Sequence, residues 1–374
     1  MRVPLVDLVA QNTETAADVR AAVDRVFETA SYIGGSDVGA FEQEYAEATG
    51  AGFCLGVGNG TDALELALRA AGVTAGGEVV LPVNTFIATA EAVSRIGAVP
   101  VFADVDEEHL LLDPDAVAAA VTSRTQAVVP VHLFGQVAPV GAIRAALGSS
   151  GIPIVEDGAQ SQGAESQDGR AGSLGLVSST SFYPGKNLGA AGDAGAVTTG
   201  DPELARTVRL LASHGSETKY VHELIGFNSR MDSVQAAVLR VKLRHLADWN
   251  RRRRVAAARY AALLDGVDGV RLPQSMHGNL DVWHLYVVRV DERDRVMAHL
   301  NAAGIGASIH YPTPLHLTAA YGGHGLGAGS FPVAEAAAGG ILSLPLYPHI
   351  TADQQEFVAE ELAQALHSDM PRST

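Results

Sequence analysis

The sequence predicts an α/β protein in which a mostly parallel sheet, with helices on both faces, precedes a smaller α+β domain. Between about residues 52 and 200, short apolar runs alternate with helical patterns that end at glycine. The apolar runs lack polar alternation, which is typical of strands covered on both faces. Beyond Met231 a long helical pattern leads into further strand-like and helical runs.

Each predicted strand of the first part is a short apolar run. FCLGVG precedes the helical TDALELALRAAG, and EVVLPV precedes TFIATAEAVSRIG. The later runs are VPVFADV, AVVPVHLFG (followed by the helical VGAIRAALG) and IPIVEDG. Because ligands bind at the carboxyl ends of the strands in such sheets, the residues that follow each strand are the first candidates for a site.

The second part begins with a helix predicted from Met231 to about Leu264, which connects the two parts. After it, WHLYVVRV and IGASIHY are predicted strands, and RDRVMAHLNAAG and TADQQEFVAEELAQALH are predicted helices. We therefore divide the chain into a large domain of residues 1–248, with an N-terminal helical segment, and a small α+β domain of residues 249–374.

Composition excludes several classes of function. The net charge of −16 over 374 residues argues against nucleic acid as a partner. Cys54 is the only cysteine, so there is no disulfide framework or cysteine-based zinc site, and we expect no metal. The start lacks a signal-peptide core, and no apolar run approaches the ~18 residues of a spanning helix. We expect a soluble cytoplasmic protein without a membrane partner.

Lys186 is conspicuous because lysine is rare in this chain. Of 26 basic residues only Lys186, Lys219 and Lys242 are lysine. Unlike arginine, a lysine amine can lose its proton and attack a carbonyl. Lys242 lies in the charge-rich run VKLRHLADWNRRRR and is expected on a solvated helix face. Lys186 lies in the glycine-rich SFYPGKNLGAAGDAG after an apolar stretch, so it is the candidate nucleophile.

The loop GVGNGTDAL (56–64) joins a strand to a helix through closely spaced glycines. Free amides at the helix start and small side chains make it a candidate phosphate site, although a tight turn alone explains it equally well. A dinucleotide-binding fingerprint is the rival interpretation. It is disfavoured because the spacing is G-x-G-x-G and because the next strand leads to Asn84, where an acidic residue would bind a ribose.

Asp157 follows the strand-like IPIVEDG, where the sheet presents functional groups. A pyridinium nitrogen at ~4 Å would compensate its charge by about 4 kcal/mol at an effective dielectric near 20. A helix cap or a buried ion pair is the alternative role, and Glu156 is the other candidate acid. Gln160 is placed to donate toward the same ligand. A phosphate cradle, an acid and a lysine together suit pyridoxal 5′-phosphate.

The chain resembles the DegT/DnrJ-type sugar aminotransferases, within the fold type I superfamily of pyridoxal-phosphate enzymes. The resemblance runs essentially end to end. It is carried by VGNGTDALELAL, LPVNTFIATAEA, VPVFADVD, VHLFGQ, VEDGAQSQGA, SFYPGKNLGAAGDAGA, GFNSRMDSVQAAVLRVKL and IHYPTPLH. It implies a fold type I transferase and transamination with a pyridoxal-phosphate cofactor.

The resemblance also implies roles for individual residues. Lys186 forms the Schiff base with the cofactor and shuttles a proton, Asp157 pairs with the pyridine nitrogen, and Gln160 bonds the ring hydroxyl. The other implied cofactor-binding residues are Phe86, which stacks on the ring, Gly60, Thr61 and Ser181, which bind the phosphate, and Asn228, which reaches the phosphate from a neighbouring subunit. The last role implies a homodimer with shared sites.

Two positions place the chain within the family. Many relatives carry histidine where this chain has Gln162, so the stacking or substrate contact of that imidazole is not carried over to this chain. Lysine at position 186 favours transamination, because a histidine there would indicate the dehydratase branch. His132 and His214 receive no role at this point.

The substrate implied by the resemblance is a nucleotide-linked keto-sugar. The stretches SHGSETKYVHELIGFNSRMD, VWHLYVVR and IHYPTPLH most resemble the branch that aminates carbon 3 of dTDP-3-keto-6-deoxyhexoses, with L-glutamate as donor. The candidate substrate-binding residues are Lys219 and Arg230 for the diphosphate, and Tyr183, His310 and Tyr311 for the sugar hydroxyls. For each of these residues a purely structural role, as a surface charge or a packed ring, explains the sequence equally well.

Other functions stay open at this point. A carbon-4 or keto-cyclitol aminotransferase would share every cofactor motif. A nicotinamide oxidoreductase would use the loop at 56–60 but leave Lys186 unexplained. A non-catalytic pyridoxal-binding regulator would keep the pocket, although the chain lacks a basic DNA-binding segment.

Overall fold

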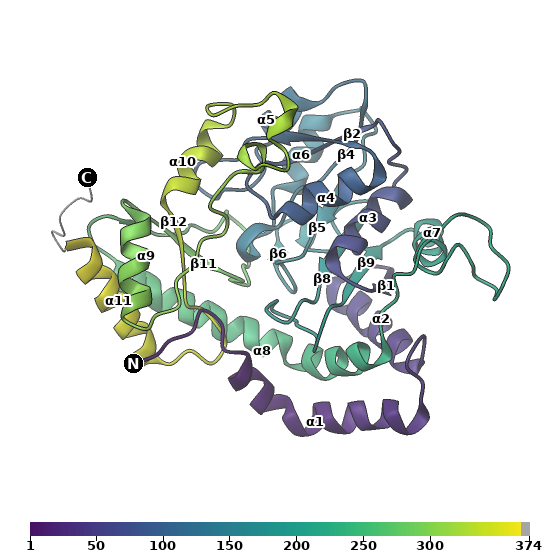
Figure 1. Cartoon of the computed structure of the whole chain (residues 1–374), viewed down its shortest axis with the longest axis horizontal. Coiled ribbons are helices and arrows are strands. Elements are labelled where there is room, and N and C mark those ends of the chain that lie inside the picture. Colours follow the sequence, from purple (N-terminus) through teal and green to yellow (C-terminus); the bar gives the residue numbers. More distant parts are fainter. Residues whose placement is uncertain (368–374) are drawn as a thin grey trace.

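A computed structural model describes residues 1–367 of the protein, except for the side chain of His324. Its centre is a sheet built from two sets of strands, ordered β1-β9-β8-β5 and β3-β2-β4 (Figure 1). Parallel bridges from Val128 to Ile154 and from Val131 to Asp157 join the two sets. The strands are β1 (Phe53–Val57), β2 (Glu78–Pro82), β3 (Val99–Ala103), β4 (Thr125–Val128), β5 (Val155–Asp157), β8 (Val177–Ser181) and β9 (Gly195–Thr199).

The sheet is mostly parallel, as the sequence predicts. β2 pairs in parallel with β3 and β4, and β5 pairs in parallel with β8. β9 is the exception, because it runs antiparallel to both β1 and β8. A small antiparallel pair, β6 (Glu165–Ser166) and β7 (Gly169–Arg170), lies outside this sheet.

Both faces of the central strands are buried, which explains their unbroken hydrophobicity. In β2, Val79 and Leu81 belong to the core cluster that includes residues of α3 and α4, whereas Val80 belongs to a second cluster with residues of α5 and α6. Successive side chains of a strand point to opposite faces, so an apolar run fills two cores. These helices are α3 (Gly60–Ala70), α4 (Ile87–Ile96), α5 (Pro114–Ala120) and α6 (Val140–Leu147), and α7 (Pro202–Ala212) follows β9.

The longest helix, α8 (Ser233–Leu264), links the large and small parts of the molecule without a break. It packs on α1 (Leu8–Thr29), α2 (Ser36–Thr49) and the C-terminal helix α11 (Ala352–His367) (Figure 1). Trp249, near its middle, is fully buried and donates its indole N–H to Glu14 of α1 (2.8 Å). The division after residue 248 stays a prediction, and residues 368–374 of the predicted small domain lie outside the described residues.

The smaller part is built on a three-stranded antiparallel sheet ordered β10-β11-β12. Its elements are β10 (Val270–Arg271), β11 (Tyr286–Val290), α9 (Arg293–Ala302), α10 (Pro332–Gly340) and β12 (Ile341–Leu344). The strand predicted at IGASIHY is reduced to single bridges, from Ile305 to Val3 and from Ser308 to Ser343. This segment packs closely against the N-terminal residues. A Cβ on Gly306 would lie 2.7 Å from the Leu5 nitrogen, so only glycine fits there.

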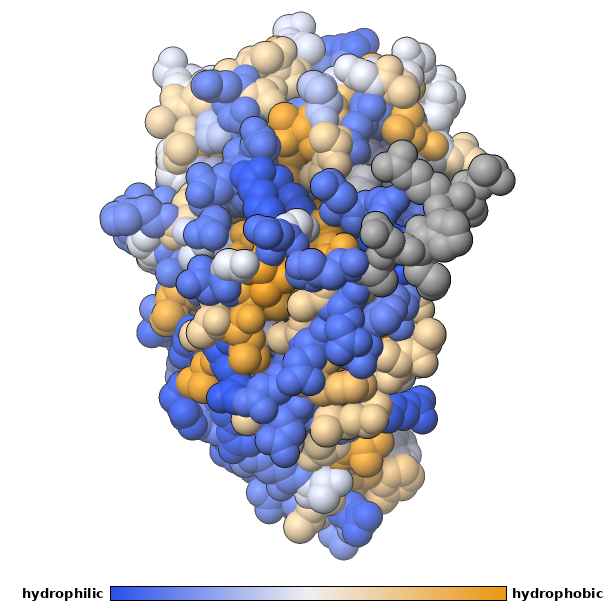
Figure 2. Space-filling view, turned by 90° about the vertical axis from the view of Figure 1, so that its left-hand side faces the viewer, coloured by the Kyte–Doolittle hydropathy of each residue, from blue (hydrophilic) through white to orange (hydrophobic). Residues whose placement is uncertain are grey.

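The surface over the smaller part is mainly hydrophilic. Seen from the side where α9 and α11 lie, hydrophilic residues form continuous bands and hydrophobic residues lie in strips between them (Figure 2). Among residues 1–367, no helix combines the length and the hydrophobicity that crossing a bilayer requires.

Candidate active site

A cavity of about 690 Å³ lies at the carboxyl ends of the central strands. The loops after β1, β2, β5 and β8 form most of its wall. The segment before β11, His310 and Tyr311 between α9 and α10, and the N-terminal Leu5 and Val6 complete it. The predicted site residues that line it are Gly60, Thr61, Phe86, Asp157, Gln160, Ser181, Tyr183, Lys186, His310 and Tyr311. Segments distant in sequence therefore meet at the edge of the sheet where ligands of α/β proteins bind.

Lys186 lies in the loop after β8 and lines this cavity. Its backbone N–H donates to the Tyr183 carbonyl (2.8 Å), which makes the loop tight. Burial lowers the pKa of the Lys186 amine from 10.5 to about 8, while the charge of Asp157 acts in the opposite direction. Near neutral pH this amine therefore loses its proton more readily than a surface lysine does.

Asp157, the last residue of β5, is 8% exposed and lines the same cavity. One carboxylate oxygen accepts a hydrogen bond from the Thr89 hydroxyl (2.8 Å), and the other accepts one from the Ala159 N–H (3.1 Å). Both donors are neutral. The negative charge of Asp157 is therefore balanced only partly by its hydrogen-bond partners, and it is available to a cationic ligand in the cavity.

Glu156, the other candidate acid, is fully buried outside the cavity. Its carboxylate accepts hydrogen bonds from His132 Nε2 (2.8 Å) and from the N–H groups of Gly172, Leu174 and Gly175. His132 Nδ1 accepts from the Ala138 N–H, so the imidazole proton lies on Nε2. Glu156 thus pairs with His132 in the interior, whereas Asp157 lines the cavity.

The start of α3 forms a cradle beside Ser181. Asn59 caps the helix by accepting a hydrogen bond from the Asp62 N–H (2.8 Å). A Cβ on Gly60 would lie 2.5 Å from the Ser181 Cβ, so glycine is required where the helix approaches the end of β8. The unpaired amides of this first turn and its positive dipole end favour an anion.

Gln160, Tyr311 and Phe86 form one wall. Gln160 Oε1 accepts a hydrogen bond from the Phe134 N–H (2.7 Å), and its Nε2 donates to the Tyr311 hydroxyl (3.1 Å). The second N–H of that amide is left for a ligand. The rings of Phe86 and Tyr311 lie 5.5 Å apart. Burial raises the pKa of Tyr311 to about 12, and the charge of Asp157 adds to the effect.

Three predicted residues do not line the cavity within one chain: Lys219, Asn228 and Arg230. All three are exposed, on or beside the segment that follows α7. Lys219 lies over the Tyr220 ring (5.0 Å to the centroid), and the backbone of Asn228 bridges to Ser213.

Gln162 is buried outside the cavity wall. Its Nε2 donates to the carbonyls of Ala159 and Ser181 and to the Thr180 hydroxyl, which ties the loop after β5 to the end of β8. Its Oε1 has no hydrogen-bond partner among the described residues. The side chain therefore braces Ser181 from behind the cavity.

The expectation that Lys242 lies on a solvated helix face is wrong. Lys242 is 4% exposed, and its Nζ donates to the Gly189 carbonyl (2.9 Å) in the loop that follows Lys186. The run VKLRHLADWNRRRR contains many charges, but α8 is packed on several sides, so one of them faces the interior. Burial lowers the pKa of its amine.

His284 also lines the cavity, and sequence reasoning missed it. The only available signal was its place in VWHLYVVR, directly before a strand. Burial lowers the pKa of His284 well below 6.5, and the charge of Lys186 contributes. Burial also lowers the pKa of His310 to about 4, again with a contribution from Lys186.

The model of the DegT/DnrJ/EryC1/StrS aminotransferase family matches residues 13–363. The chain belongs to this family. It is a pyridoxal-phosphate-dependent aminotransferase, with the fold type I architecture that the sequence predicts.

Individual relatives are similar over almost their whole length. The erythromycin biosynthesis sensory transduction protein EryC1 of Saccharopolyspora erythraea is 48% identical over 97% of this chain and 99% of its own. A dTDP-3-amino-3,4,6-trideoxy-alpha-D-glucose transaminase of Streptomyces venezuelae is 46% identical over 94% and 93%. A crystal structure of S. venezuelae DesV in complex with a ketimine intermediate superposes with a TM-score of 0.96, at 45% identity and over 98% and 99% of the two chains.

The cavity of this aminotransferase fits pyridoxal phosphate. The cradle at Gly60 and Ser181 suits the phosphate, Asp157 suits the ring nitrogen, and Lys186 suits the aldehyde. In the part of the chain that is described, no three His, Cys, Asp or Glu side chains are grouped to hold a metal ion.

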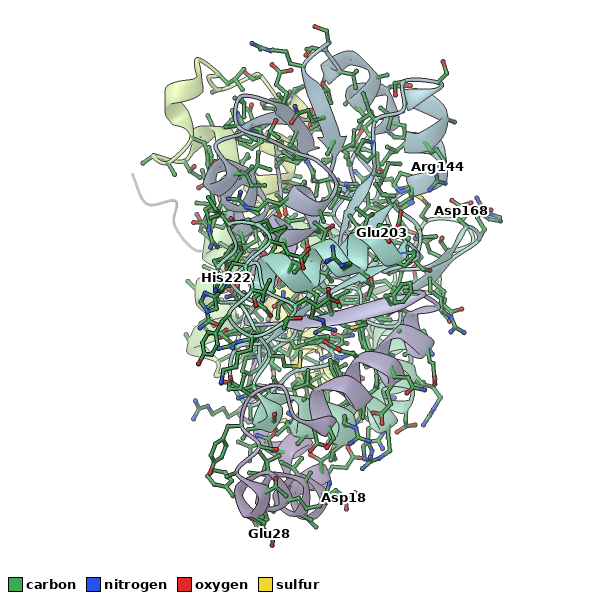
Figure 3. All side chains as sticks on the ribbon, turned by 90° about the vertical axis from the view of Figure 1, so that its right-hand side faces the viewer. Asp18, Glu28, Arg144, Asp168, Glu203 and His222 are labelled. Carbon is green, nitrogen blue, oxygen red and sulfur yellow. The ribbon has the colours of Figure 1, made fainter. Side chains whose placement is uncertain are left out.

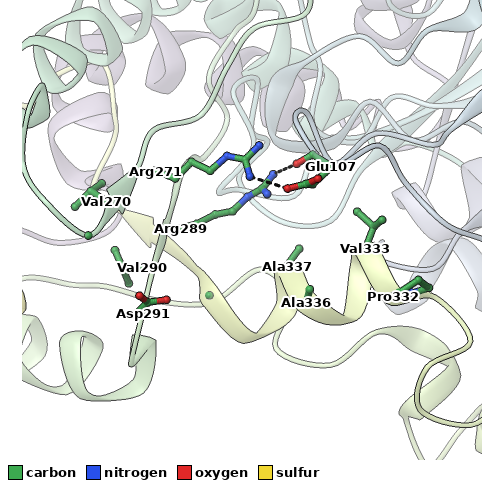
Figure 4. A pocket seen from close by; sticks show the side chains of 12 residues that line it. Glu107, Val270, Arg271, Arg289, Val290, Asp291, Pro332, Val333, Ala336 and Ala337 are labelled. Carbon is green, nitrogen blue, oxygen red and sulfur yellow. Dashed lines mark hydrogen bonds and ion pairs between the residues drawn. The ribbon is translucent and has the colours of Figure 1, made fainter.

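A second cavity, of about 670 Å³, lies between β10, β11 and α10 (Figure 4). Arg271 donates to the Glu107 carboxylate (3.0 Å), and Arg289 donates to the backbone carbonyls of Glu107 and Glu108. No residue lines both cavities, and this one contains no lysine. It therefore lacks a group that condenses with an aldehyde.

We expect Lys186 in the cofactor-free enzyme to react with an amine-directed reagent with a midpoint near pH 8, because burial destabilises its ammonium form. Asp157→Asn should move the midpoint lower, because the carboxylate is the group that raises this pKa. Peptide mass mapping of modification against pH measures both values. A midpoint at the ordinary 10.5 would contradict the cavity environment described here.

Glu156→Gln should cost roughly 3–5 kcal/mol of unfolding free energy in urea denaturation, because it breaks a buried hydrogen-bonded pair. Burial acts to raise the pKa of Glu156, but His132 and the amides outweigh it and hold the pKa below the ordinary 4.5. The pair therefore stabilises fully above pH 4.5 and loses its effect as the pH falls through the folded-state pKa. The unfolding free energy of the variant should therefore fall less steeply than that of the wild type as the pH is lowered below 4.5.

Glu165→Gln, at a half-exposed surface pair with Arg170, is the control, and it should cost under about 1 kcal/mol of unfolding free energy.

Proposed function

We propose that the enzyme transfers the amino group of L-glutamate to carbon 3 of a dTDP-3-keto-6-deoxyhexose in deoxyaminosugar biosynthesis. The observation that carries the proposal is the position of Lys186, which is half-buried and lines one cavity with Asp157 and the cradle at Gly60. The name of the S. venezuelae relative, a dTDP-3-amino-sugar transaminase, supports carbon 3 and the thymidine diphosphate.

Pyridoxal phosphate, when bound, supplies an electron sink and a carrier for the amino group. The residues of this chain supply the rest. Asp157 is a buried carboxylate with neutral partners, so it holds a protonated ring nitrogen. Lys186, with a pKa of about 8, is partly unprotonated near neutral pH and both accepts and returns a proton at the substrate carbon.

The sugar end of the cavity is lined by Tyr183, His310 and Tyr311. His310 is neutral at physiological pH because its pKa is about 4, so it contacts sugar hydroxyls rather than balancing a phosphate charge. Its Nδ1 lies 2.8 Å from the Ser343 hydroxyl, which fixes the ring. The cations for the diphosphate are the exposed Lys219 and Arg230, and these lie outside the cavity of their own chain.

We propose that a second copy of the chain brings these groups to the cavity. Residues 214–228 form an arm after α7 that projects from the body in Figure 1, and His222 marks it in Figure 3. The arm exposes large apolar side chains, with Ile225 97%, Tyr220 81% and Val221 56% accessible. Such clustered exposure in a single chain is typical of a surface that another chain covers. Lys219 and Asn228 are on this arm.

The name of EryC1 assigns a sensory role to that relative. A regulator that binds pyridoxal phosphate would keep the same pocket, so the glutamate half-reaction distinguishes the two functions. The aminotransferase family and the name of the S. venezuelae transaminase favour the enzyme.

With pyridoxal phosphate bound, L-glutamate should abolish the visible absorbance of the lysine-linked cofactor and release 2-oxoglutarate. Lys186→Ala should slow this half-reaction by at least about 10²-fold. Lys219→Ala should leave it intact but raise KM for the keto-sugar. Matched dTDP-3-keto and dTDP-4-keto sugars then identify the carbon. Faster turnover of the 4-keto sugar would overturn the carbon-3 assignment. If L-glutamate left the absorbance unchanged and released no 2-oxoglutarate, the proposed transamination itself would be overturned.

Ile225→Asp should dissociate the dimer and remove most keto-sugar turnover, because it places a charge in the proposed interface. Sedimentation velocity measures the mass of each variant. Val255→Asp, at an exposed apolar position on α8, is the matched control and should keep the mass of the wild type. A wild-type enzyme that sediments as a monomer while fully active would contradict the shared site.

A further inference from the structure

Ser229 directly follows the arm and is buried between two exposed residues, Asn228 and Arg230. Its backbone N–H donates to the carbonyl of Ala212 at the end of α7 (2.9 Å). Just before it, the backbones of Asn228 and Ser213 form an antiparallel bridge, which closes the arm at its root. The side chain of Ser229 therefore starts from a fixed point of the fold.

The Ser229 hydroxyl joins this point to the start of α3. It accepts a hydrogen bond from the Gly58 N–H (3.1 Å) and donates one to a carboxylate oxygen of Asp62 (2.8 Å). Gly58 lies in the loop that enters the helix, and Asp62 lies in the first helical turn. The other carboxylate oxygen of Asp62 accepts a hydrogen bond from Arg95 of α4 (2.9 Å). One hydroxyl thus holds the segment 58–62 at both ends.

The cradle within this segment consists of backbone groups that need support from outside. Asn59 caps α3 through the Asp62 N–H, and no partner is found among the described residues for the N–H groups of Gly60 and Thr61. These two N–H groups bind an anion well only if the backbone already holds them in place. The glycines on either side of Asn59 make that backbone easy to distort. The contacts of Ser229 supply the rigidity that the loop itself lacks.

The charge of Asp62 is a second reason for holding this segment. A carboxylate is favourable in the first turn of a helix, but it repels an anion that binds at the same end. Ser229 and Arg95 each bond one carboxylate oxygen, and Arg95 also offsets the negative charge. Asp62 is not among the described residues that line the cavity. Its carboxylate is therefore held outside the space that an anion would occupy.

We propose that Ser229 is a positioning residue for the phosphate of pyridoxal phosphate, because its hydroxyl fixes residues 58–62 so that the Gly60 and Thr61 amides meet the phosphate. This role rests on the proposed function, in which the cradle at Gly60 binds the phosphate. It differs from the role of the exposed neighbours Asn228 and Arg230, which are proposed to act at the cavity of a second chain.

The test compares the binding of two ligands to the cofactor-free enzyme: pyridoxal phosphate, and pyridoxal, which lacks the phosphate. Both carry the aldehyde that condenses with Lys186, so borohydride trapping and peptide mass mapping measure the fraction bound at each concentration. Ser229→Ala should weaken the binding of pyridoxal phosphate about 10-fold, because the cradle loses two hydrogen bonds. The same variant should change the binding of pyridoxal by less than about 2-fold, because Ser229 does not contact the ring or the aldehyde.

Ser233→Ala is the matched control. Ser233 begins α8 and is 1% exposed, against 2% for Ser229, and its hydroxyl also accepts a backbone N–H, that of Gly35 (3.3 Å). The control should bind both ligands as the wild type does. Ser229→Cys keeps a side chain of similar size whose thiol forms only weak hydrogen bonds. It should also weaken the binding of pyridoxal phosphate, and it carries the test if Ser229→Ala fails to fold.

Thermal unfolding of each variant checks that the fold is retained. An unchanged affinity of folded Ser229→Ala for pyridoxal phosphate would overturn the proposal. An equal loss of affinity for both ligands would overturn it too, because that is the effect of a merely structural serine. Equal affinities of the wild type for the two ligands would overturn the cradle and this role with it. The glutamate half-reaction of the wild type is measured separately, and its failure would count against the proposed function instead.

Discussion

Two opposing effects set the pKa of Lys186: burial lowers it, and the charge of Asp157 raises it. The rest of the site depends on this balance. Burial alone would lower the pKa of the Lys186 amine further and favour its neutral, reactive form, but it would also leave a cavity with nothing to hold a cationic ring. Asp157 supplies that charge and raises the pKa of Lys186, so the value near 8 reflects both effects. The hydrogen-bond donors of Asp157, the Thr89 hydroxyl and the Ala159 amide, are neutral, so they stabilise the carboxylate and leave its charge to act on Lys186 and on a cationic ring.

The surrounding structure maintains this balance through backbone placement. β5 presents Asp157 to the cavity and Glu156 to the interior because consecutive strand residues face opposite ways. Glu156 then binds His132 and the turn at 172–175, which fixes the strand end from behind. Gln162 donates to the Ser181 carbonyl at the end of β8, and Lys242 donates to the Gly189 carbonyl. Buried side chains thus anchor the chain both before and after Lys186.

The sequence was sufficient to predict the functional residues that belong to short local motifs. Lys186, Asp157 and Gly60 follow strands, and the parallel sheet brings strand ends together, so their meeting could be expected. The interior position of Lys242 could not, because a helix packed on several sides gives no simple face in the sequence. His284 was missed for a related reason: it precedes a strand of the smaller sheet, and only tertiary packing brings it to Lys186. Asn228, Lys219 and Arg230 lie away from the cavity of one chain, so their roles depend on an assembly that the fold of one chain does not determine.

The N-terminal segment has a practical consequence for handling this enzyme. Val3 is fully buried and bridges to Ile305, and Leu5 and Val6 form part of the cavity wall. A truncation that removes these residues would open this wall of the cavity to bulk water. Affinity tags fused ahead of Met1, which is exposed, need a spacer long enough to leave Val3 in its place.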